Sequence, residues 1–239
     1  MLRAALFDLD DTLISSYANP GPAWRSVVRE FTPAIGLEQV EQVGAALARE
    51  MAQFLRDDEN RRLWRIKAVA TRRQAVQDAL LRNDFAAFAD IAGDIADRYA
   101  SFREENMALH PGALEVLDYY RGRGIKLGLV TNGATETQRM KIDRFDLGRR
   151  FDHIQIEEEA GFGKPDGRAY MITLAALDVP ATDAQMTGDD LIWDVVAPKR
   201  LGMRAIWFNP FDLPMPDAPA TPDITIRSLG ELLPGSDPG

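Results

Sequence analysis

The chain has 239 residues, with 28 lysines and arginines against 37 aspartates and glutamates, so its formal charge is −9. This length suits one large domain or one domain with a sizeable insertion, and the acidic balance argues against a nucleic-acid partner. With no cysteine and two histidines, the sequence excludes disulfides, iron–sulfur clusters, thiol nucleophiles and three-histidine metal sites. We find no apolar run of the roughly 18 residues that a membrane span needs and no signal-peptide pattern, and we therefore expect a soluble cytoplasmic protein without a membrane partner.

The apolar and polar pattern divides the chain into a helical stretch and a region of alternating strands and helices. A buried strand is expected over residues 2–9, and helical periodicity then continues for about 80 residues, with the later segments near 61–82 and 84–105. Further helices are expected over 112–122, 135–145 and 166–177 and after Asp189, and strands over 126–132, 152–156, 184–187, 203–208 and 223–227. The proline-rich stretch before the last strand reads as a surface loop.

Strands that alternate with helices of this length form right-handed βαβ units. We therefore predict an α/β fold with a doubly wound, mostly parallel, Rossmann-like sheet that is interrupted after its first strand by an all-helical insertion. The core is expected to comprise residues 1–16 and 108–239, and the insertion residues 17–107. In such sheets ligands bind outside the carboxyl ends of the strands, so the residues that follow each strand are candidates for chemistry.

The first predicted strand ends in two carboxylates, Asp8 and Asp10. Because they are two residues apart on an extended chain, both point to the same side. Two carboxylates held together repel each other unless a cation lies between them or one is protonated. A solvated acidic turn is the alternative interpretation. A calcium loop is excluded, because Leu13 and Asn19 stand where that loop needs a glycine and an acidic residue.

Two later segments carry groups that suit an anion. Thr131, Asn132 and Gly133 follow a strand and offer a hydroxyl, an amide and a flexible backbone at a helix start, although the same residues also form ordinary turns. Lys164 lies in a Gly-Lys-Pro turn, where it either directs an ammonium at a phosphate or is a surface lysine. A P-loop is excluded, because Lys164 lacks the upstream glycine and the following Ser or Thr.

The strand near residue 187 is followed by Asp189, Asp190 and Asp194. Capping of the next helix explains one of these acids but not all three. Carboxylates from two strand ends suit a hard cation such as Mg²⁺, and Thr131 and Lys164 suit a dianion beside it. Such carboxylates, a bound cation and anion-binding groups together are typical of sites for phosphoryl transfer, in which catalysis is mostly positioning and charge neutralisation.

These residues resemble the four ordered motifs of the haloacid dehalogenase-like (HAD) superfamily. The matching segments are Asp8-x-Asp10-x-Thr12, Thr131, Lys164-Pro165 and Gly188-Asp189-x-x-x-x-Asp194. The resemblance covers the whole chain, and the helical insertion looks like the cap domain of the family.

The resemblance implies a role for each matched residue. Asp8 would be the nucleophile that forms an aspartyl-phosphate, and Asp10 would protonate the leaving oxygen and later activate water. Thr131 and Lys164 would hold the transferring phosphoryl group, and Asn132 would add a phosphate contact.

The resemblance also implies a Mg²⁺ site. The Asp8 carboxylate, the main-chain carbonyl of Asp10 and the Asp189 carboxylate would bind the ion, with Asp194 in support. Pro198 departs from the family pattern: it has no N–H for the carbonyl of Asp194, so we expect the helix to kink or start late there. Our hypothesis is that this shifts Asp194 modestly without abolishing metal binding.

Asp10 favours a phosphatase, because the dehalogenases that named the superfamily lack an acid at this position. The implied function is a Mg²⁺-dependent phosphomonoester hydrolase of a small metabolite, of the nucleoside monophosphate or sugar phosphate class, acting as a monomer or homodimer. The alternatives are a 2-haloacid dehalogenase, a phosphomutase and, less favoured, a non-catalytic binding module of the same fold.

Within the insertion, Arg73 is expected to be buried, because it lies in an apolar helical stripe. The stripe is formed by Ile66, Val69, Val76 and Leu80. A buried arginine needs a carboxylate or phosphate partner, so Arg73 either pairs with an acid of the insertion or binds an anionic group of the substrate. Tyr17 and Trp24 either stack on a substrate ring or pack in the protein.

Overall fold

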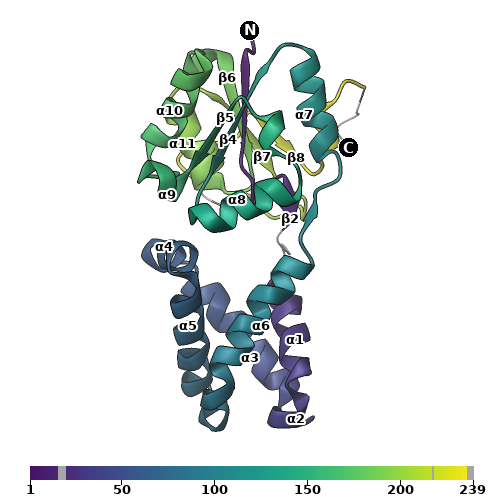
Figure 1. Ribbon diagram of the computed structural model, residues 1–239, viewed down its shortest axis with the longest axis vertical. Helices are drawn as coiled ribbons and strands as arrows, with labels where there is room; N and C mark the ends of the chain where they lie inside the picture. The colour runs from purple at the N-terminus through teal and green to yellow at the C-terminus, as the bar shows by residue number, and fades with distance from the viewer. Residues whose placement is uncertain (16–19, 217, 236–239) are drawn as a thin grey trace. The chain divides into compact units, whose positions relative to one another are not determined.

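The computed structural model describes residues 1–15, 20–216 and 218–235 (Figure 1). The chain divides into two compact units, one of Met1–Ser15 with Ala108–Gly239 and the other of Ser16–Met107. Within the described residues, none of the helices combines the length and the apolar character that a membrane span requires.

The first unit is built on a parallel sheet, which has six strands among the described residues in the order β5-β4-β1-β6-β7-β8. The strands are β1 (Ala4–Phe7), β4 (Lys126–Thr131), β5 (His153–Ile156), β6 (Ala184–Gly188), β7 (Arg204–Phe208) and β8 (Ile224–Ile226). In the centre, Phe7 of β1 lies opposite Leu129 of β4 and Thr187 of β6. A short antiparallel pair that was not expected, β2 (Ile14–Ser15) with β3 (Ala108–Leu109), forms where the chain leaves this unit and returns to it.

Helices cover both faces of this sheet (Figure 1). They are α7 (Ala113–Gly122), α8 (Thr135–Arg144), α9 (Glu157–Ala160), α10 (Gly167–Leu177) and α11 (Ala197–Arg200), with the short turns η2 (Gly148–Arg150), η3 (Ala181–Asp183), η4 (Leu191–Val196) and η5 (Leu229–Leu232). Leu6 packs in one cluster with Tyr170 of α10, whereas the neighbouring Phe7 contacts Tyr120 of α7 with ring centroids 6.1 Å apart. Because successive strand residues point to opposite faces, α10 and α7 cover opposite sides. The predicted doubly wound α/β fold is confirmed.

The second unit is helical in the part of the chain that is described. Its elements are α1 (Pro20–Glu30), α2 (Thr32–Ile35), α3 (Val40–Phe54), α4 (Asp58–Ile66), α5 (Ala68–Arg82), η1 (Ala86–Ile91) and α6 (Ala92–Glu105). Its core gathers Val27, Leu47 and Leu80, and Trp24 stacks on Tyr99 with centroids 3.6 Å apart. Trp24 therefore packs within this unit, and Tyr17 lies outside the described residues.

Two of the helical segments were expected to be continuous and are not. The segment over 61–82 is divided into α4 and α5 at Lys67, whose backbone leaves the helical region. Near this break the carbonyl of Leu63 accepts both the Lys67 N–H at 2.9 Å and the Thr71 hydroxyl at 3.2 Å, which ties the start of α5 to the end of α4. The segment over 84–105 begins as the 3₁₀ turn η1 before it becomes α6.

The expectation that Arg73 is buried was wrong. Its side chain is 53% exposed and pairs with Asp97 of α6, with Nε 3.0 Å from Oδ1. The break at Lys67 interrupts the apolar stripe, and Val69 is exposed. The buried face of α5 is formed by Ala75, Val76, Ala79 and Leu80. Val76 and Leu80 of the predicted stripe belong to this face. The two alanines beside them do, too, but a search for large apolar residues does not find them. The Asp97 pair accounts for Arg73 without a substrate.

Candidate active site

The carboxyl ends of the central strands bring the expected acids together. Asp8 follows β1 directly, and Asp189 follows the adjacent β6. The Asp8 N–H donates to the carbonyl of Thr187 at 3.0 Å, so parallel pairing continues up to the first acid. Thr131 is the last residue of β4, on the other side of β1, and is 1% exposed.

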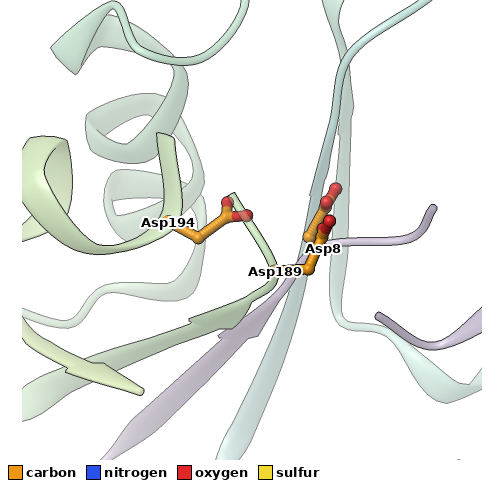
Figure 2. Close-up of side chains that lie close together, drawn as sticks. All are labelled: Asp8, Asp189 and Asp194. Carbon is orange, nitrogen blue, oxygen red and sulfur yellow. The ribbon is translucent and has the colours of Figure 1, made fainter. Parts of the chain in front are cut away.

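Asp8, Asp189 and Asp194 form a carboxylate cluster. One oxygen of each lies within 4.8 Å of the others, and Figure 2 shows the Asp194 side chain turned toward the other two. Asp8 and Asp194 are 7% and 0% exposed, whereas Asp189 is half-buried and accepts a hydrogen bond from the Thr12 hydroxyl at 3.3 Å. Burial raises the pKa of Asp8 to about 7, despite the opposing attraction of Lys164.

Lys164 is the buried cation of the site. Its Nζ lies 2.7 Å from Oδ1 of Asp8 and 2.7 Å from Oδ1 of Asp194, and the lysine is 3% exposed. Burial alone opposes its charge, but Asp194 and Asp8 together raise the pKa of Lys164 above its usual range. The lysine is therefore a permanent positive charge beside the Asp8 carboxylate.

Asn132 fixes the main chain of Lys164. Its Nδ2 donates to the Lys164 carbonyl at 2.7 Å, and its Oδ1 accepts from the Lys164 N–H at 2.8 Å. Gly163 makes this approach possible, because a Cβ there would lie 2.4 Å from Oδ1 of Asn132. The Asn132 side chain thus positions Lys164, and both ends of its amide are engaged in doing so. A phosphate contact by Asn132, which the resemblance implies, stays a prediction.

The two acids Asp190 and Asp194, in the turn after β6, have different contacts. Asp190 caps η4, because Oδ1 accepts from the N–H groups of Ile192 and Trp193 at 2.9 Å each. Asp194 instead points back, and its Oδ2 accepts from the Asp190 N–H at 3.1 Å. Capping therefore occupies Asp190 and leaves Asp194 to face Lys164.

Pro198 lies just beyond a π-helical turn. In η4 the Ala197 N–H donates to the carbonyl of Ile192, five residues back, and α11 begins at Ala197. Pro198 therefore occupies the first turn of α11, where a missing N–H removes no helical hydrogen bond. The α-helix starts late, one of the two outcomes that the proline suggested.

Asp10 contacts two polar side chains of α8, Gln138 and Lys141, that no motif in the sequence singles out. Lys141 Nζ lies 2.7 Å from Oδ1 of Asp10, and Gln138 Nε2 lies 2.9 Å from Oδ2. One signal for them existed: α8 contains few apolar residues, so the face that it buries has to include polar ones. Its buried residues are Gln138, Lys141 and Ile142, at helical spacing.

The chain is similar in sequence and in fold to known proteins. The haloacid dehalogenase-like hydrolase family matches residues 2–202. The chain belongs to this family. It is 30% identical to a phosphoserine phosphatase of Thermus thermophilus over 252 residues, covering 97% of this chain and 98% of the relative. A ribulose-1,5-bisphosphate 5-phosphatase of Halopiger xanaduensis is also 30% identical, over 243 residues and with the same shares. The HAD hydrolase YfnB of Bacillus subtilis, solved bound to magnesium, superposes with a TM-score of 0.67 at 23% identity, over 97% of this chain and 96% of its own.

The site of this HAD-like hydrolase has a donor set that fits a hard divalent cation. Burial, and then the neighbouring Asp8, raise the pKa of Asp189 well above its ordinary value, so an ionised Asp189 is unfavourable without a counter-charge. A divalent cation held by Asp8 and Asp189 would remove that cost. Asp194 is less available as a ligand, because both of its oxygens already accept hydrogen bonds.

Proposed function

We propose that this HAD-like hydrolase is a Mg²⁺-dependent phosphomonoester hydrolase of a small phosphorylated metabolite, acting through an aspartyl-phosphate on Asp8. The observation that carries the proposal is the position of the Asp8 carboxylate. It stands at the end of a central strand, in a cluster with Asp189, and 2.7 Å from a buried ammonium. An anionic nucleophile that must approach an anionic phosphate needs such positive charge beside it.

The residues support a two-step transfer. An Asp8 oxygen attacks phosphorus, and the bond from phosphorus to the ester oxygen breaks. The ester oxygen keeps the electron pair of that bond and receives a proton from Asp10. A water then attacks the same phosphorus and gives a proton back to Asp10, so that the Asp8–phosphorus bond breaks and inorganic phosphate leaves. Lys164 and the Thr131 hydroxyl hold the equatorial oxygens in both steps, where charge is spread over them.

Mg²⁺ supplies charge neutralisation between the carboxylates and the phosphoryl oxygens when it is bound. The Asp8 carboxylate, the Asp10 main-chain carbonyl and the Asp189 carboxylate would hold it. Asp194 would not bind the ion directly. It accepts hydrogen bonds from Lys164 Nζ and from the Asp190 N–H, and so holds both groups in place beside the metal ligands. The helix after Asp190 begins with a π-helical turn in which Asp194 faces Lys164, and the hypothesis that Pro198 does not abolish metal binding stays a prediction.

The substrate class rests on the relatives and on the second unit. Relatives of similar length are phosphatases of phosphoserine and of a sugar bisphosphate. We propose that residues 1–16 and 108–239 are the catalytic core and that residues 17–107 act as a cap that selects the leaving group. A nucleoside monophosphate or a sugar phosphate is the proposed substrate.

The test is phosphate release from p-nitrophenyl phosphate, with and without Mg²⁺. Native protein should release phosphate only with Mg²⁺, and Asp8→Asn should release none. Asp183→Asn is the control and should match the native protein, because Asp183 precedes β6 at the end of the strand opposite Asp189. Chloride release from a 2-haloacid without metal, together with no phosphate release, would instead identify a dehalogenase. Transfer of phosphate within a sugar phosphate would identify a mutase. If none of these activities were found, a non-catalytic binding module would be the remaining interpretation.

A further inference from the structure

A polar network on α8 encloses the Asp10 carboxylate. Lys141 Nζ donates to both Asp10 oxygens, at 2.7 Å to Oδ1 and 2.8 Å to Oδ2. Gln138 Nε2 donates to Asp10 Oδ2 at 2.9 Å and to Oγ1 of Thr131 at 2.5 Å. The Gln138 carbonyl oxygen in turn accepts from Lys141 at 2.8 Å. The four side chains therefore form one closed network.

The burial of this network separates it from an ordinary surface ion pair. Gln138 and Lys141 are 2% and 9% exposed, although both residue types are mostly exposed in proteins. The Asp10 side chain keeps 29% of its surface exposed, so it is held from the α8 side while its other side stays accessible. A buried ammonium is costly unless its hydrogen bonds are well made, and here the acceptors are Asp10 and Gln138.

The network also links two functional positions. α8 starts shortly after Thr131 and carries Gln138 and Lys141 three residues apart, on one face. Gln138 has one orientation that satisfies all of its contacts, because its oxygen must face Lys141 and its nitrogen must face Asp10 and Thr131. The Gln138 amide therefore positions both the Thr131 hydroxyl, which is proposed to hold the phosphoryl group, and the Asp10 carboxylate, which is proposed to exchange a proton with the substrate.

We propose that Lys141 and Gln138 are positioning residues that hold the Asp10 carboxylate in a single orientation relative to the phosphoryl group bound at Thr131. This inference rests on the proposed function, in which Asp10 protonates the leaving oxygen. Proton transfer requires the donor to lie within hydrogen-bond reach of the acceptor, so a protonated Asp10 carboxyl group that is free to rotate transfers its proton less often. The network therefore matters most when the leaving group needs its proton.

Leaving-group dependence distinguishes this role from a structural one. p-Nitrophenolate departs readily without protonation, whereas the more basic phenolate depends on an acid. The value of kcat/KM reports on the step in which the leaving group departs, because that is the first irreversible step. We would measure it with Mg²⁺ for p-nitrophenyl phosphate and phenyl phosphate in native protein, Lys141→Met, Lys141→Arg and Gln138→Leu.

For Lys141→Met, kcat/KM for phenyl phosphate should fall by at least about tenfold more than for p-nitrophenyl phosphate, since general acid catalysis contributes roughly 10²–10⁴-fold. Lys141→Arg, which keeps a cationic donor, should recover part of the loss, and Gln138→Leu should show the same preference more weakly. The Mg²⁺ concentration at half-maximal rate should stay unchanged. Lys199→Met, which removes a lysine 2.7 Å from Asp223 elsewhere in the same unit, is the matched control and should behave as native.

Equal losses on both esters, or no loss, would overturn the positioning role while leaving the proposed function standing. If Lys141→Met does not fold, Gln138→Leu and Lys141→Arg give the same comparison. Absence of phosphate release from the native protein, or full activity of Asp8→Asn, would remove the proposed function, and this inference would fall with it.

Discussion

Lys164 and Asp194 form an ion pair that is almost completely removed from solvent. Nζ lies 2.7 Å from Oδ1, and the two side chains are 1% and 0% exposed. The same ammonium contacts Asp8, so a single cation compensates two buried carboxylates. Removal of one partner from such an arrangement leaves buried charge without compensation.

We therefore predict that Lys164→Met lowers the free energy of unfolding by about 3–5 kcal/mol in metal-free protein, as measured by urea denaturation. Adding Asp194→Asn to this variant should restore part of the loss, because it removes one of the two uncompensated charges. Lys199→Met, at a more exposed pair, should cost far less. Similar losses for the two lysine variants would contradict the account.

Gly188 is required by the side chain of Asp194. A Cβ at this position would lie 2.2 Å from Cγ of Asp194, so Gly188→Ala has to displace the carboxylate or the strand end. We predict a loss of about 1–3 kcal/mol in unfolding free energy, with weaker Mg²⁺ binding by titration calorimetry. Gly122→Ala is the control: nothing lies within 4 Å of its Cβ, so its stability should be kept or slightly raised. A Gly188→Ala variant as stable as native would show that the site tolerates the shift.

Asp189 should destabilise the metal-free protein and stabilise the loaded one. Its pKa is raised by burial and by Asp8, so ionisation at neutral pH is unfavourable without a cation. Asp189→Asn should therefore melt at or above the native temperature without Mg²⁺ and should lose the Mg²⁺-induced rise in Tm. Asp183→Asn should retain that rise. A full Mg²⁺ shift in Asp189→Asn would place the cation elsewhere.

His110 should make the protein less stable in mild acid. No described residue hydrogen-bonds its Nε2, its ring contacts Phe208 edge-on at 4.9 Å, and burial lowers its pKa below the ordinary 6.5. The unfolded chain therefore takes up a proton first as the pH falls below 6.5, so folding stability declines from that point toward the folded pKa.

The measurement for His110 is the fall in Tm between about pH 7.5 and about pH 5, which should be smaller in His110→Asn than in native protein. The pKa of His153 is also lowered by burial, so His153→Asn should reduce the fall as well. The double variant should show the smallest fall of the four proteins. Parallel pH curves for native protein and His110→Asn would refute the assignment.

The strand ends could be predicted from the sequence because each apolar run stops at polar residues. Asp8, Thr131 and Asp189 follow or end neighbouring parallel strands, and the sheet brings those ends to one edge. Lys141 and Gln138 could not be selected in this way, since lysine and glutamine on a helix usually face solvent. Pro198 predicted that the α-helix kinks or starts late, but the π-helical turn before α11 holds about one more residue per turn than an α-helix, which no residue type specifies.

The proposal that Asp8 carries the phosphoryl group is tested most directly by locating the residue to which that group becomes attached. Native protein with Mg²⁺ and excess p-nitrophenyl phosphate would be quenched in acid during turnover, and its peptides mapped by mass spectrometry. We expect one added phosphoryl group on the peptide that contains Asp8 in native protein, and none on that peptide in Asp8→Asn. Steady phosphate release with no label on that peptide, or with label on another residue, would contradict the proposal.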